Sequence, residues 1–139
     1  MAEDQQILPP DHDRISKHRA VVEEAVRTRD GGSLPGGKGD LAVLQRLIDG
    51  KAFAPSQTYE LQSLGIVLGQ VLAAHPGLAW VTVKDQYGTD PALRYRDTSI
   101  LIFPLTMISK RVEDGAEVDV EYLYEATLNH IRKLETAGE

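Results

Sequence analysis

The stretch from Gly32 to Lys38 has the residue spacing of a phosphate-binding loop. Its glycines and its lysine stand ahead of an expected helix, and in such loops the backbone amides and the lysine hold phosphate groups. Gly39, however, occupies the place of the Ser or Thr that would hold magnesium, and a helix rather than a strand is expected before the loop. We therefore interpret residues 30–39 as a glycine-rich connector, with nucleotide binding as the alternative.

Imidazole and carboxylate side chains, which are metal ligands, lie close together near the N-terminus at Asp11, His12, Asp13 and His18. His12 and His18 are six residues apart, so they point to different sides of a helix. We interpret the group as the charged start of a helix, where acidic residues meet the positive end of the helix dipole. We predict no metal site and no cofactor.

Motifs for catalysis are missing from this sequence. The chain has no cysteine, no Gly-x-Ser-x-Gly and no His-Glu-x-x-His, so the common hydrolytic and zinc mechanisms have no basis in it. We interpret His75 as a helix-end residue and His130 as a surface or boundary residue, rather than as general bases. A pair of carboxylates that meet only in space is the open alternative, and we assign no catalytic residue.

A group of aromatic, basic and acidic residues near the expected strands has the composition of a recognition surface. Arg94 and Arg96 are two residues apart, so on one strand they would share a face, and guanidinium groups beside aromatic rings suit interfaces and anions. The alternative is structural: Asp85 and Asp90 would neutralise the arginines across a hairpin, and the later cations would lie at a helix C-terminus. The candidate binding surface comprises Trp80, Asp85, Tyr87, Arg94, Arg96, Lys110 and Arg111.

Helices are expected on both sides of the segment that holds this surface. Apolar residues recur at helical spacing over residues 11–29, 40–49, 56–74, 104–112 and 119–134. The third of these helices has a broad apolar band, so we expect it at the centre of the domain. Within it, Gly65 and Gly69 would allow another part of the backbone to approach closely.

Three strands are expected between the third and fourth helices. Apolar and polar residues alternate over residues 79–86 and again at Leu93 and Tyr95, with turn residues at 87–91 between them. An apolar run over residues 99–103 predicts a third strand that is central or covered on both faces. The order of elements predicts an α+β fold, a small antiparallel sheet of about three strands packed with four to five helices.

Length and composition indicate a single domain over residues 1–139, with residues 1–10 as a flexible tail and residues 40–135 as its core. The formal net charge of −6 disfavours phosphate backbones, so we predict no nucleic-acid partner. The acidic N-terminus is unlike a secretion signal, and no apolar run reaches the roughly 20 residues of a membrane span. We therefore predict no membrane partner and a cytoplasmic location.

Five segments of the sequence carry a resemblance to a known family. They are Leu64–Gly69, Trp80–Val81, Asp85–Gly88, Ala92–Tyr95 and Phe103–Arg111. In residue type and order they resemble the bacterial family called domain of unknown function 3806, over more than half of the chain. The resemblance implies a small sheet with helices, and it implies no mechanism because the family has no established activity.

Missing catalytic motifs and acidic charge favour a non-catalytic cytoplasmic protein. We expect a protein-binding or accessory module with a basic or toxin-like partner, or a homo-oligomer formed through Trp80 and the third helix. The alternative is a small-anion-binding enzyme or ligand sensor with a pocket between the sheet and the helix after Pro104, where Arg94 or Lys110 and Arg111 hold the anion. Cations that converge without carboxylate partners would favour the alternative, and scattered or paired cations would favour the module.

Overall fold

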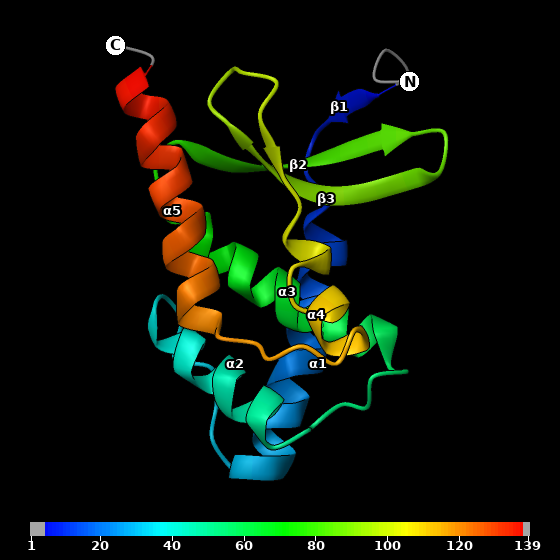
Figure 1. Cartoon of the computed structure of the whole chain (residues 1–139). Helices are drawn as coiled ribbons and strands as arrows, with labels where there is room; N and C mark the ends of the chain where they lie inside the picture. Colours follow the sequence, from blue (N-terminus) through cyan, green and yellow to red (C-terminus); the bar gives the residue numbers. More distant parts are fainter. Residues whose placement is uncertain (1–4, 138–139) are drawn as a thin grey trace.

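The structure of the chain is a computed structural model that describes residues 5–137 (Figure 1). Over these residues the chain forms five α-helices, one 3-10 helix and four strands, an α+β fold as predicted. In chain order the elements are β1 (Gln6–Leu8), α1 (His12–Asp30), α2 (Gly39–Asp49), α3 (Thr58–Leu72), β2 (Leu78–Asp85), β3 (Gly88–Tyr95), β4 (Leu101–Ile102), η2 (Pro104–Thr106), α4 (Ser109–Glu113) and α5 (Val120–Ala137). Across the same residues, no helix combines the length and the apolar character that a membrane span requires.

The four strands form one antiparallel sheet in the order β1-β2-β3-β4. β4 has two residues, pairs with β3 at Leu93 and Arg94, and lies at the edge of the sheet. Both residues of β4 are half-buried, so the prediction that the apolar run over residues 99–103 is a strand that is central or covered on both faces is wrong. Ile100 and Ile102 pack against the helical core, which accounts for the apolar character of a segment at the edge of the sheet.

The strand that the sequence did not predict, β1, lies within the segment expected to be a flexible tail. β1 pairs with residues 82–84 of β2, at the edge opposite β4. For residues 6–8 the tail prediction is wrong, because three residues are too few for an alternating pattern to be recognised without their partner strand. Residues 1–4 of the predicted tail lie outside the described part of the chain.

The hairpin of β2 and β3 is tighter than predicted. Only Gln86 and Tyr87 separate the two strands, so the turn expected over residues 87–91 lies mostly within β3. Pro91 is opposite Thr82 of β2. A proline is compatible with this strand because β4 pairs only with Leu93 and Arg94, so β3 has no second partner strand at Pro91.

Helix α3 lies at the centre of the helices, as predicted, and contacts α1, α2, α4, α5 and η2 (Figure 1). Gly65 and Gly69 let η2 approach closely, also as predicted. A β-carbon at Gly69 would lie 2.8 Å from the Cγ atom of Pro104 and 2.6 Å from the Cη2 atom of Trp80. The segment after Pro104 is divided into η2 and α4, so that Leu105 packs with Ile15 beside α3 while Ile108 joins the main core.

The glycine-rich connector between α1 and α2 contacts the rest of the fold at several points. The amide of Gly36 donates to the Oδ1 atom of Asp40 at 2.7 Å, and Leu34 packs against the core. Asp40 is buried and lies 3.4 Å from a guanidinium nitrogen of Arg19 on α1. A loop amide therefore holds the chain's own carboxylate where a phosphate-binding loop would hold a phosphate.

Candidate functional site

Asp85 and Tyr87 lie at the turn of the β2–β3 hairpin. The Oδ1 atom of Asp85 accepts a hydrogen bond from the Tyr87 amide at 2.8 Å, so this carboxylate stabilises the turn. Tyr87 is 88% exposed. Asp90 pairs with Arg14 at 3.6 Å, so the expected pairing of these two carboxylates with the strand arginines is wrong. The sequence does not reveal that the start of α1 lies beside the hairpin.

Arg94 and Arg96 do not share one face of a strand. β3 ends at Tyr95, and Arg96 follows in the left-handed conformation with φ +48°, so the alternation of a strand no longer applies to it. The Nε atom of Arg94 donates to the carbonyl oxygen of Thr98 at 2.7 Å. The Arg96 guanidinium donates to the Oε2 atom of Glu135 at 2.9 Å. Each arginine is thus engaged with a different part of the chain.

Trp80, Lys110 and Arg111 lie on other elements. Trp80 faces the helices, where its ring covers Gly69 of α3. Arg111 donates to the carbonyl oxygen of Met107 at 2.7 Å, and Lys110 is exposed on α4. Tyr87 precedes β3 and Arg96 follows it, so roughly 30 Å of extended chain separates them. The structure therefore does not bring the seven predicted residues together into one site.

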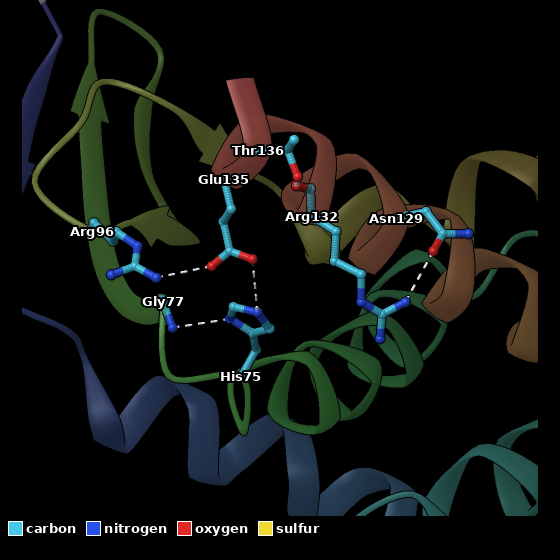
Figure 2. Close-up of polar contacts among 7 residues, drawn as sticks. All are labelled: His75, Gly77, Arg96, Asn129, Arg132, Glu135 and Thr136. Carbon is cyan, nitrogen blue, oxygen red and sulfur yellow. Dashed lines mark hydrogen bonds and ion pairs between the residues drawn. The ribbon is translucent and has the colours of Figure 1, made fainter. Parts of the chain in front are cut away.

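A polar cluster joins α5 to the two turns that flank the β2–β3 hairpin (Figure 2). The Oε1 atom of Glu135 lies 3.8 Å from the Nε2 atom of His75, while its Oε2 atom accepts from Arg96. The Nδ1 atom of His75 accepts from the Gly77 amide at 2.9 Å, so in neutral His75 the proton is assigned to Nε2, toward Glu135.

Charge in this cluster is compensated internally. The hydrogen bond from Arg96 lowers the pKa of Glu135 below its usual value, and the same bond raises the pKa of Arg96. Arg96 is therefore not an unpaired cation that would hold an anionic ligand. The cluster instead connects α5 to the sheet. The sequence placed Arg96 on the candidate binding surface, with pairing to Asp85 or Asp90 as the structural alternative, and it indicated neither Glu135 nor the contact with His75.

A second pair that the sequence did not predict lies between α1 and α3. The Nδ1 atom of His18 is 2.7 Å from the Oγ atom of Ser63, and both residues are buried. Because the Ser63 hydroxyl donates to the Tyr59 carbonyl oxygen at 3.0 Å, we assign the His18 proton to Nδ1, which leaves the buried Nε2 atom without a partner in the described residues. Burial, and secondarily the charge of Arg14, lower the pKa of His18.

The His18–Ser63 contact has the reach of a nucleophile and its base, but no substrate could approach it. Ser63 is 0% exposed in the middle of α3, and the Tyr59 ring stacks on His18 at 4.5 Å between centroids. His18 is a core residue, not part of an exposed charged helix start. The sequence could have indicated this burial, because His18 lies on the same helical stripe as the apolar residues Ile15 and Val22.

One concave feature of residues 5–137 is an apolar groove with a volume of about 930 Å³. It opens between the α2–α3 connection, residues 50–57, and the α4–α5 connection, residues 114–119. Leu61 and Leu64 of α3 line it, together with Phe53 from the first connection and Val118 from the second. Sixteen residues line it, of which eleven are apolar, one is glycine and four are polar or charged. Sequence reasoning missed the groove because the apolar residues of each connection do not reveal that the two connections face each other.

Residues 40–124 match the protein family described as Domain of unknown function (DUF3806). The chain belongs to this family. The match includes all five segments on which the resemblance was based. The DUF3806 chain is also similar in fold to a protein of Bacteroides thetaiotaomicron VPI-5482 known from a crystal structure at 1.50 Å resolution, with 22% sequence identity and a TM-score of 0.82. The similarity covers 91% of the DUF3806 chain and 48% of that protein, so the chain spans about half of its length. No curated protein matches the DUF3806 chain.

The groove lies entirely within the part of the DUF3806 chain that matches the family. Its lining residues run from Leu47 to Val118, inside residues 40–124. His18 and Glu135, which belong to the two polar clusters, lie outside that range. The groove is therefore built entirely by the family-matching part of this chain, from α2, α3, α4 and the connections at residues 50–57 and 114–119.

Proposed function

We propose that this DUF3806 chain is a non-catalytic cytoplasmic module that binds a protein partner through the apolar groove between residues 50–57 and 114–119. The observation that carries the proposal is this uncovered apolar surface. Exposed apolar surface that is rimmed by polar residues is typical of sites at which proteins interact. Ile48, Phe53 and Val118 are half-buried beside the groove, and a partner would remove their remaining apolar surface from water.

The alternative, a small-anion enzyme or ligand sensor, has less support. Its pocket was expected between the sheet and the helix after Pro104, where the Pro104 ring, Gly69 and Trp80 are in close contact. The arginines expected to hold the anion are engaged elsewhere, Arg94 with a carbonyl oxygen and Arg96 with Glu135. Scattered and paired cations favour the binding module.

Charge and packing favour a protein partner over the other classes. The net charge of −6 opposes binding to a phosphate backbone and favours a basic protein. A homo-oligomer formed through Trp80 has less support, because its ring packs against α3 of the same chain. We therefore propose a different protein as the partner, and we place the contact at the groove.

Site-specific photocrosslinking in cells of the source organism tests the proposal. A photoreactive residue replaces Ala54, which is exposed and lines the groove, and in a control chain it replaces Ala126, which is exposed on α5. The expected result is one discrete adduct with another protein from position 54 and none from position 126. Adding Ala116→Trp, which fills the groove from its other wall, should abolish the adduct.

Three outcomes would overturn the proposal. They are the absence of any protein adduct at position 54, an adduct that also forms at position 126, and an adduct that survives Ala116→Trp. An adduct with the mass of two copies of this chain, each 15.3 kDa, would show that the groove binds a second copy rather than a different protein.

A further inference from the structure

We infer that the segment bound in the groove is a peptide in which one large apolar side chain is flanked by lysine or arginine, an inference that rests on the proposed function. The apolar part of this description follows from the apolar residues that line the groove. Leu61 and Leu64 line it and are already buried, whereas Phe53 and Val118, from the two connections, keep part of their surface exposed. A leucine-sized or aromatic side chain would remove the apolar surface that Phe53 and Val118 still expose from water.

The basic part follows from the charges at the margin. Asp49 and Glu117 line the groove from opposite sides, against a single cation, Lys51. Glu113 and Asp114 are exposed between Val112 and Gly115, two further lining residues. Carboxylates on both sides of an apolar floor complement a peptide that carries positive charge on both sides of its apolar anchor.

These carboxylates are available to a partner. In residues 5–137, Asp49, Glu113, Asp114 and Glu117 form no ion pair within 4.0 Å. Asp49 accepts one hydrogen bond from Gln45, and Glu113 lies 3.4 Å from the hydroxyl of Thr58. Both contacts are with neutral groups, and Lys51 is the single cation that lines the groove, so this margin keeps a net negative charge. A purely apolar peptide would form no ion pair with these carboxylates, and an acidic peptide would be repelled by them.

Selection from a random library of 12-residue displayed peptides on the purified full-length chain tests the inference. The expected result is enrichment of peptides with a large apolar residue between lysines or arginines. Their affinity should fall when salt is raised and should be largely lost in Ala116→Trp. The charge-reversing variant Glu117→Lys should weaken binding by about threefold or more, whereas Glu125→Lys, with the same charge change on α5, should not.

The outcomes separate this inference from the proposed function. Enriched peptides that need the groove but lack lysine and arginine would overturn the inference and leave the proposed function standing. Peptides that bind equally to Ala116→Trp, or equally to Glu117→Lys and Glu125→Lys, would also overturn it. The photocrosslinking result decides the proposed function independently, because it does not depend on the sequence of the peptide.

Discussion

The Trp80 ring of β2 lies directly over Gly69 of α3. A β-carbon at Gly69 would come within 2.6 Å of the Cη2 atom of Trp80, closer than real β-carbons approach another atom. Pro104 occupies the adjacent space, with its Cγ atom 2.8 Å from the same position. The sheet, α3 and η2 therefore meet at a point where only glycine leaves enough room.

Gly69→Ala is expected to destabilise the fold by about 1 to 3 kcal/mol, because the added methyl group forces the Trp80 ring and η2 to move. Urea unfolding followed by Trp80 fluorescence measures the change. Gly32→Ala is the matched control, since nothing lies within 4 Å of a β-carbon at Gly32. Equal unfolding midpoints for the two variants would show that α3 and η2 are not packed as described.

Glu135→Gln should loosen the attachment of α5 to the sheet, because it removes the carboxylate that Arg96 and His75 share. The pKa of Glu135 is lowered in the folded chain, so its charge stabilises the fold above the unfolded pKa of about 4.3 and this stabilisation is lost as the pH falls. We expect wild type and variant to differ in unfolding midpoint at pH 7 and to converge at low pH. A difference that persists in acid, or that Glu125→Gln reproduces at pH 7, would contradict the role of the ion pair.

Much of the fold could be predicted because it depends on local pattern. Asp11 and Asp119 cap α1 and α5 through hydrogen bonds to the amides of Arg14 and Tyr122, and such capping is visible in the sequence. The central position of α3 follows from its broad apolar band. β1 could not be predicted in the same way, because three residues become a strand only through their pairing with β2.

The candidate surface was harder to predict because it depends on which distant segments meet. Arg96 leaves the sheet one residue after β3 ends, and its partner Glu135 is 39 residues away in the sequence. The groove likewise depends on two connections that no sequence pattern links. His18 is a different case, because its place on the apolar stripe of α1 was visible and only its polar character suggested exposure.

His18 should make the stability of the protein depend on pH below neutrality. Its pKa is lowered by burial, so below about pH 6.5 the unfolded chain binds a proton more readily than the folded chain. Stability should therefore fall as the pH falls, with a slope that approaches about 1.4 kcal/mol per pH unit, the value for one proton. Urea unfolding between pH 5 and 8 measures this slope. His18→Leu should reduce it, whereas His130→Gln, at an exposed position of α5, should not. An unchanged slope in His18→Leu would show that His18 is not the group that titrates.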